Sequence, residues 1–242
     1  MNLVGGSRAM RIIKPFVRIT TRNMSLSKKP ILYGDEASPP VRFVMMTAST
    51  LNMDLEFHKI DLFKLENKTK FYTKINPLQK VPVLSINGQV IYDSHAIALH
   101  MCRIKKDNEL YPEDNVLRTK IDEMMYFNSG VLFPIDSAIF TEFFAGQATD
   151  EMKIKKWCSA LDYLEFKLNG NKFLNGDKMR LSDLCCGTTV SSLETFVSML
   201  DRHKRVKEWL DHLNTIPCFE INKLGLSRLD TFVKIFKQRV SK

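Results

Sequence analysis

The segment ILYGDEASPPVRF, residues 31–43, places the hydroxyl of Ser38 directly before Pro39 and Pro40, where a strand pattern gives way to a helical one. Serine is a common helix N-cap, and proline suits the first helical turn because its missing N–H is not needed there. The hydroxyl therefore either caps the helix or donates a hydrogen bond to an anionic ligand at the positive helix end. The other nearby hydroxyl, that of Tyr33, falls inside the strand and is interpreted as packing.

A second chemically competent pair is Asp93 and Ser94, just ahead of an apolar series that includes Ile97 and Met101. That spacing is helical and places both side chains at a helix N-terminus. There they either cap the helix or, together with the backbone N–H groups, hold the charged end of a ligand. His95 belongs to the same motif and flanks it.

Residues 126–144, YFNSGVLFPIDSAIFTEFF, predict an aromatic-rich helix that carries Phe133, Asp136 and Phe140. Aromatic helical faces usually belong to a core. The aspartate stands among apolar neighbours just after Pro134, a residue type that weakens a helix locally. It is either a solvated or capping residue, or a lone carboxylate in an apolar pocket that accepts a hydrogen bond from a ligand hydroxyl.

The elements that must position these side chains follow from hydrophobic periodicity and turn residues. In chain order they are a strand at 30–35, a helix at 39–52, a strand at 55–62, a short helix or loop at 66–77, strands at 81–86 and 89–93, and a helix at 94–104. Asn87-Gly88 between the last two strands is a strong signal for a tight hairpin. Beyond the polar linker 105–115 the strand patterns stop. This predicts an α/β domain over 30–105 and an all-helical domain over 115–242.

The net charge of +9 is concentrated at the N-terminus. Seven of the 36 Lys and Arg residues, and no acidic residue, lie in residues 1–30, so the remainder holds 29 basic and 27 acidic residues. A nucleic-acid-binding groove is therefore not expected. Residues 1–29 are expected to lie outside the fold. They are interpreted as a dispensable extension with Met24 as the working start or, over 1–23, as a mitochondrial targeting segment, because they are Arg-rich and free of acids.

The five cysteines show neither CxxC spacing nor a Cys/His cluster. This pattern favours buried thiols in a reducing compartment over disulfides or a metal site. No stretch of about 18 consecutive apolar residues occurs, so no integral membrane segment is expected.

The joint order of these motifs resembles the glutathione transferase fold, a thioredoxin-like domain followed by an all-helical one, over residues 30–235. Within that family, ILYGDEASPPVR, DLF, DSHAI and LFPIDS are most similar to the insect epsilon class and to its Noppera-bo subgroup, which is associated with ecdysteroid biosynthesis. The resemblance implies glutathione as co-substrate, no metal, a cytoplasmic location and a homodimer.

By this resemblance Ser38 is the catalytic residue that stabilises the glutathione thiolate. The Val81-Pro82 bond is expected to be cis, a form that is cheap only before proline, and Val81 is expected to pair its backbone with the cysteinyl part of glutathione. Without the resemblance, Pro82 is an ordinary strand-entry residue. Ser94 is expected to hold the γ-glutamyl carboxylate and Asp93 the ammonium. The implied glutathione-binding residues are Gln79, Lys80, Val81, Pro82, Asp93, Ser94 and His95.

Gln79 departs from the family pattern, because delta and epsilon members usually have histidine there. Its amide can still form hydrogen bonds, and Lys80 can reach the glycyl carboxylate. The second substrate, apolar and sterol-like, is expected between the domains, with Asp136 accepting a hydrogen bond from its hydroxyl. The residues expected to line its site are Pro39, Leu62, Phe63, Phe133, Asp136, Ser137 and Phe140.

Asp183 resembles the buried aspartate near the start of the family's sixth helix, which binds backbone N–H groups. Arg180 stands where a Ser or Thr would complete the reciprocal capping box, so that box is expected to be incomplete.

The leading hypothesis is a glutathione transferase that binds a sterol-like compound. A second hypothesis is a steroid carrier that uses the same fold without turnover, and Gln79 and Lys80 favour it. A glutathione-dependent thiol transferase is less favoured because position 38 holds a serine and not a cysteine.

Overall fold

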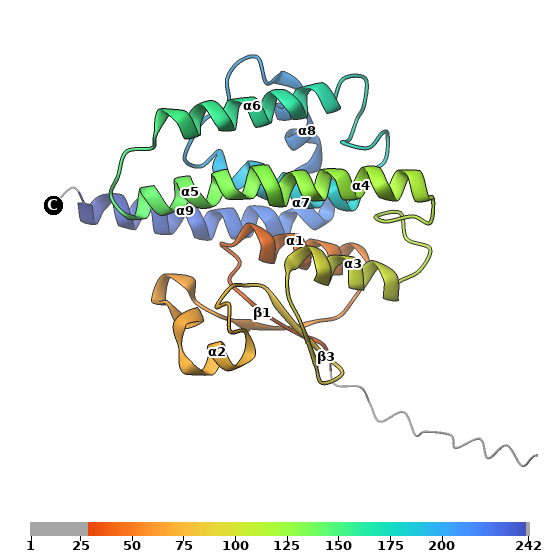
Figure 1. The fold of residues 1–242 in the computed structure, drawn as a ribbon, viewed down its shortest axis with the longest axis horizontal. Coiled ribbons are helices and arrows are strands. Elements are labelled where there is room, and N and C mark those ends of the chain that lie inside the picture. Colours follow the sequence, from red (N-terminus) through yellow and green to blue (C-terminus); the bar gives the residue numbers. More distant parts are fainter. Residues whose placement is uncertain (1–28, 241–242) are drawn as a thin grey trace, which may run out of the picture.

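The computed structural model describes residues 29–240. The targeting hypothesis for residues 1–23, and all but the last residue of the predicted extension, lie outside the described residues. In the described part, a four-stranded sheet with flanking helices is followed by helices only (Figure 1). The predicted fold class, a thioredoxin-like domain followed by a helical one, is confirmed.

The sheet has the strand order β2-β1-β3-β4. Strand β1 pairs in parallel with β2 and antiparallel with β3, and β3 pairs antiparallel with β4. The strands are β1 (Ile31–Gly34), β2 (Glu56–Lys59), β3 (Val83–Ile86) and β4 (Gln89–Ile91), and the helices among them are α1 (Pro39–Thr50), α2 (Lys70–Ile75) and α3 (Ser94–Ile104). Helices α1 and α3 cover the face of the sheet that is turned toward the helical part, and α2 lies on the other face (Figure 1).

The hairpin predicted at Asn87-Gly88 is confirmed. Both residues have positive φ, 51° and 76°, as the tight turns between antiparallel strands require. Strand β4 ends at Ile91, earlier than predicted, because Asp93 caps α3. Its carboxylate accepts a hydrogen bond from the N–H of His95 at 2.7 Å.

The strand predicted over residues 55–62 is too long, since β2 ends at Lys59. The alternating pattern continues to residue 62, but Asp61 starts a short 3₁₀ turn. Its carboxylate accepts a hydrogen bond from the N–H of Phe63 at 3.0 Å. Local capping thus overrides the periodicity.

The rest of the described chain is helical and stacks on α1 and α3 (Figure 1). Its elements are α4 (Asn115–Phe127), the π-helical η3 (Asn128–Leu132), α5 (Phe133–Phe144), α6 (Glu151–Lys167), α7 (Leu181–Leu193), α8 (Lys204–Leu213) and α9 (Glu220–Val240), and the short 3₁₀ turns of the chain are η1 (Leu62–Lys64), η2 (Glu66–Lys68) and η4 (Pro217–Phe219). Pro134 lies in the first turn of α5, directly after the π-helical segment, and cannot donate an α-helical hydrogen bond.

Helix α7 forms the centre of the helical part, with 12 of its 13 residues buried. Its start is organised by Asp183, which is fully buried and accepts hydrogen bonds from Leu174 N–H (2.9 Å), Arg180 N–H (2.8 Å) and Trp209 Nε1–H (3.0 Å). The structural role predicted for Asp183 is confirmed. The capping box has one arm only, because an arginine side chain offers no acceptor. The five cysteines are free, and all but Cys158 are buried.

Candidate active site

Ser38 occupies the N-cap of α1 through its backbone. Its carbonyl accepts hydrogen bonds from the N–H groups of Val41 and Arg42, each at 3.1 Å, whereas its hydroxyl makes no capping bond to any described residue. The reason is that Pro39 and Pro40 have no N–H to offer, and the next N–H is already bonded to the carbonyl. The interpretation of the hydroxyl as a cap is therefore wrong. It lies free at the positive end of α1.

Ser38 lies between two cavities. The larger one, the polar cavity, has a volume of about 500 Å³ and is lined by the segment before β3, the N-terminus of α3, and residues of η3 and α7. The structure brings all seven residues predicted to bind glutathione to its wall, beside Ser38: Gln79, Lys80, Val81, Pro82, Asp93, Ser94 and His95.

The segment that precedes β3 forms one wall of the polar cavity, and it is a turn held by hydrogen bonds. The Val81-Pro82 bond is cis, as predicted. Gln79 has a φ of 57°, and its side chain is engaged within the protein, because Oε1 accepts from Lys68 Nζ at 3.0 Å and Nε2 donates to Thr73 Oγ1 at 3.2 Å. Val81 lies just outside the sheet ladder, whose pairing begins at Val83.

At the start of α3, a chain of three side chains reaches into the polar cavity. Asp93 Oδ1 is 3.0 Å from His95 Nδ1, and His95 Nε2 is 3.3 Å from the Sγ of Cys185 in α7. Burial raises the pKa of Cys185 well above its usual range, so its thiol stays protonated beside Nε2. The hydrogen bond between Asp93 and His95 helps to hold the pKa of Asp93 below its ordinary value. His95 thus orients Asp93 and does more than flank it.

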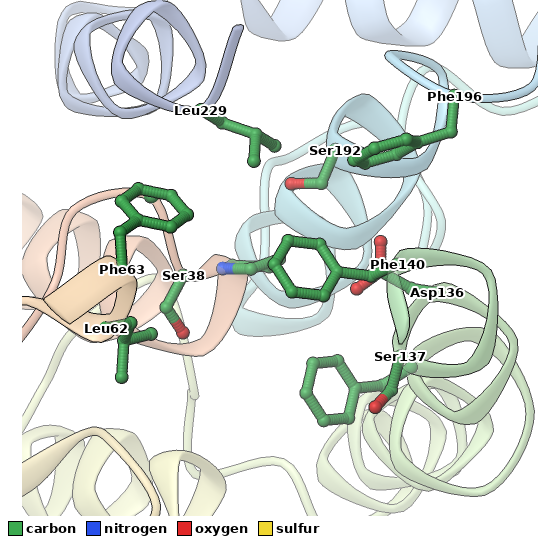
Figure 2. A pocket seen from close by; sticks show the side chains of 12 residues that line it. Ser38, Leu62, Phe63, Asp136, Ser137, Phe140, Ser192, Phe196 and Leu229 are labelled. Atoms are coloured by element: carbon green, nitrogen blue, oxygen red, sulfur yellow. The ribbon is translucent and has the colours of Figure 1, made fainter. Parts of the chain in front are cut away.

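The smaller cavity, the apolar cavity, has a volume of about 190 Å³. Figure 2 shows Leu62 and Phe63 on one side of it, Asp136 and Phe140 opposite, and Ser38 between them. All seven residues predicted for the second substrate line this cavity: Pro39, Leu62, Phe63, Phe133, Asp136, Ser137 and Phe140. Four residues line both cavities, which makes them neighbours: Ser38, Leu62, Phe133 and Ser137.

The carboxylate of Asp136 faces the apolar cavity with only 6% of the residue exposed. Burial raises its pKa to about 7, against the attraction of the fully buried Arg42. No described residue donates a hydrogen bond to it. The Arg42 guanidinium is occupied elsewhere, by Asn222 Oδ1 (2.8 Å), the carbonyl of Ala37 (2.7 Å) and the hydroxyl of Ser192. Asp136 therefore has free hydrogen-bonding capacity toward a ligand.

Comparison with known proteins agrees with this geometry. Residues 32–109 match the family model for the glutathione S-transferase N-terminal domain. Glutathione S-transferase D7 of Drosophila melanogaster is 30% identical over 207 residues, which cover 84% of this chain and 92% of that protein. The chain belongs to the glutathione S-transferase family.

Solved structures of glutathione S-transferases share the whole described fold. An epsilon-class glutathione S-transferase from the housefly, Musca domestica, has a TM-score of 0.81 and 34% sequence identity over 86% of this chain and 98% of that one. A glutathione transferase homologue from Drosophila mojavensis with bound glutathione has a TM-score of 0.81 and 32% identity over 85% and 96%. This protein is thus an insect-type glutathione transferase, an enzyme with glutathione as its co-substrate, as the motifs indicated.

Some cavity residues of this glutathione S-transferase carried no recognisable sequence signal. They come from the helical part: Asn128, Ser129, Cys185, Thr188 and Thr189 in the polar cavity, and Ser192, Phe196 and Leu229 in the apolar one. Asn128 could have been suspected only from its place in a π-helical segment, a feature that is frequent at functional sites, but that segment is itself visible only in the structure.

Within residues 29–240, no group of three or more His, Cys, Asp or Glu side chains is placed to hold a metal ion. None of the helices described there is long and apolar enough to cross a membrane.

Proposed function

We propose that this glutathione S-transferase activates the glutathione thiol through Ser38. The observation that carries the proposal is the place of the Ser38 hydroxyl. It is free of the helix cap, lies at the N-terminus of α1, and borders both cavities. A thiolate there accepts a hydrogen bond from the hydroxyl and is stabilised by the helix dipole. Each unit by which its pKa falls corresponds to about 1.4 kcal/mol.

The proposed peptide site is the polar cavity. Asp93, held by His95, faces the γ-glutamyl ammonium, and Ser94 with the first N–H groups of α3 holds the γ-glutamyl carboxylate. Val81 pairs its backbone with the cysteinyl part, and Lys80 attracts the glycyl carboxylate. Residues 30–105 thus serve glutathione, and residues 115–242 contribute most of the second site.

The proposed second substrate is an apolar, hydroxylated, sterol-like compound in the apolar cavity. Asp136 supports this choice, because a carboxylate buried among aromatic rings is best satisfied by a single hydroxyl on an otherwise apolar ligand. The cavity volume of about 190 Å³ lies below the range of about 300 to 1,000 Å³ that ligand pockets usually have. A sterol-sized ligand would therefore fill the apolar cavity with one end only and protrude from it.

The sequence motifs favour the epsilon class and its Noppera-bo subgroup, and a sterol-like substrate fits that assignment. We therefore assign the enzyme a role in ecdysteroid biosynthesis, as a cytoplasmic homodimer.

The decisive experiment compares conjugation of a chlorodinitrobenzene-type electrophile by the wild type and Ser38→Ala. Removing one thiolate-stabilising donor is expected to lower kcat by roughly 100-fold. Ser49→Ala, which removes an exposed hydroxyl near the other end of α1 and outside both cavities, is the matched control and is expected to keep the wild-type rate. Equal rates for wild type and Ser38→Ala would contradict the proposal.

The alternative, a steroid carrier without turnover, is favoured by Gln79. Both ends of its amide are already bonded to Lys68 and Thr73, so it is less available to glutathione. A carrier would bind sterol at equilibrium without glutathione, lose that binding in Asp136→Ala, and show no conjugation above background.

A further inference from the structure

An ion pair between Arg228 of α9 and Asp35 joins the two parts of the fold beside Ser38. Arg228 Nε lies 2.7 Å from Asp35 Oδ1, and Nη2 lies 2.8 Å from Oδ2, so the contact is bidentate. The Asp35 side chain is fully buried, whereas 27% of the Arg228 side chain is exposed. Burial would raise the pKa of Asp35, but the hydrogen bonds from Arg228 and two backbone N–H groups hold it below its ordinary value. Both partners are therefore charged.

The Asp35 carboxylate also binds two backbone segments that border the apolar cavity. Its Oδ1 accepts from the N–H of Ala37 and its Oδ2 from the N–H of Leu62, both at 3.0 Å. The Asp35 carbonyl also accepts from the N–H of Ser38 at 2.9 Å. One buried residue thus sets the backbone that presents the Ser38 hydroxyl and the segment that carries Leu62 and Phe63.

Arg228 itself also contacts the segment that carries Leu62 and Phe63. Its Nη2 is 3.4 Å from Oδ1 of Asp61, which caps the turn containing Phe63, and its guanidinium lies 5.2 Å from the Phe63 ring centroid. This is a cation–π distance. The Phe63 ring also stacks on Phe232, one turn further along α9, with ring centroids 3.5 Å apart. Leu229, the neighbour of Arg228, lines the apolar cavity.

Helix α9 lies close to the loop of residues 35–38, so a displacement of the helix at Arg228 would also displace that loop. Gly225 lies one turn before Arg228, and a Cβ at that position would collide with the Arg42 side chain and the Glu36 carbonyl. The helix thus packs directly against the loop at Gly225, and the Arg228–Asp35 pair adds a bidentate contact between the two.

We propose that Arg228 is a positioning residue for thiol activation. Through Asp35 it aligns the Ser38 hydroxyl at the end of α1, and it thereby couples the docking of α9 to the reactivity of glutathione. The inference rests on the role proposed for Ser38. Lysine can replace this arginine only in part, because only the planar fork of arginine bonds to both carboxylate oxygens.

The test uses three variants of the full chain and one control. Arg228→Lys keeps the charge but loses the fork, and Arg228→Gln loses the charge. The double variant Asp35→Asn with Arg228→Gln replaces the pair by two amides, so that no uncompensated buried charge remains. The control is Lys234→Gln on the same helix, which removes an exposed pair with Asp230. For each protein, the thermal midpoint, kcat, the KM for glutathione and the thiolate absorbance of bound glutathione against pH are measured.

In the Arg228→Gln protein and in the double variant, the thiol pKa of bound glutathione is expected to rise and kcat to fall about 10- to 100-fold, the cost of a small misplacement of a reacting group. The KM for glutathione is expected to change less than about threefold, because the peptide contacts lie elsewhere. Arg228→Lys is expected to be intermediate, and Lys234→Gln unchanged.

Folded Arg228 variants with wild-type kcat and thiol pKa would overturn the inference. Loss of folding in all three variants would also overturn it, because the pair would then serve stability alone. If Ser38→Ala, measured in parallel, has the thiol pKa of the wild type, the proposed function itself fails. A normal effect of Ser38→Ala with no effect at Arg228 refutes this inference alone.

Discussion

Asp136→Asn tests whether burial raises the pKa of Asp136, because that shift makes the free energy of unfolding depend on pH. Burial raises the pKa of Asp136 from an ordinary value of 3.8 to about 7, although Arg42 opposes the shift. The folded protein therefore holds a proton that the unfolded chain has released between these two pH values. In that window the free energy of unfolding falls as the pH rises, and the loss is complete above the folded-state pKa. Asparagine does not titrate, so the Asp136→Asn variant does not undergo this loss of unfolding free energy as the pH rises.

The magnitude follows from the same shift. Each pH unit within the window changes the free energy of unfolding by about 1.4 kcal/mol. From pH 5.5 to pH 8 the protein crosses roughly the upper 1.5 units of the window, so the wild type should lose about 2 kcal/mol relative to Asp136→Asn. This is a measurable part of the roughly 5 to 15 kcal/mol that stabilises a typical protein.

The assay is urea unfolding of the wild type, Asp136→Asn and Ser137→Ala at pH 5.5 and 8. Ser137→Ala is the control, since it alters the same cavity without removing a charge. Its difference from the wild type is expected to be the same at both pH values. A difference between the wild type and Asp136→Asn that does not change with pH would refute the assignment of a buried, proton-binding carboxylate.

Three further changes test other parts of the structure. Asp183→Ala leaves the buried N–H groups of Leu174, Arg180 and Trp209 without their acceptor, and urea unfolding should show a loss of at least roughly 3 kcal/mol, at about 1 kcal/mol or more for each donor. Cys185→Ala removes the side-chain partner of His95 Nε2 and should raise the KM for glutathione about threefold with little change in kcat. Its control is Cys186→Ala, because that buried thiol faces the Met124 carbonyl instead, and an equal effect in both variants would contradict the orienting role. Gly225→Ala should lower the thermal midpoint through overpacking worth about 1 to 3 kcal/mol, whereas Gly130→Ala, with open space around it, should not.

The sheet and its attached helices could be predicted from sequence because their signals are local. The Asn87-Gly88 turn, the proline pair after Ser38 and the Asp93 cap each act within four residues of themselves. The error at residues 55–62 has the same origin, since two local signals competed there and the capping carboxylate of Asp61 prevailed over the alternating pattern.

Some residues of the candidate site could likewise be predicted from local sequence signals, and others could not. Residues at the starts of α1, β3 and α3 could be placed from sequence because turn and capping signals mark element ends, and the resemblance to glutathione transferases supplied their expected roles. The wall supplied by α7 could not, because a helix buried on nearly every side has no amphipathic period to indicate which side chains face a cavity.

The sequence by itself determined which residue types stand at the element ends: the serine before two prolines, the valine before Pro82, and the aspartate and serine at 93 and 94. They mark the ends of elements, where turn and capping preferences act within a few residues of the chain. Only the tertiary structure decided that Asp136 is buried beside Ser38, and that Arg228 meets Asp35 across 193 residues of chain. Proton affinity and ion pairing depend on the surrounding solvent and charges, and the packing of the helical part on α1 creates those surroundings.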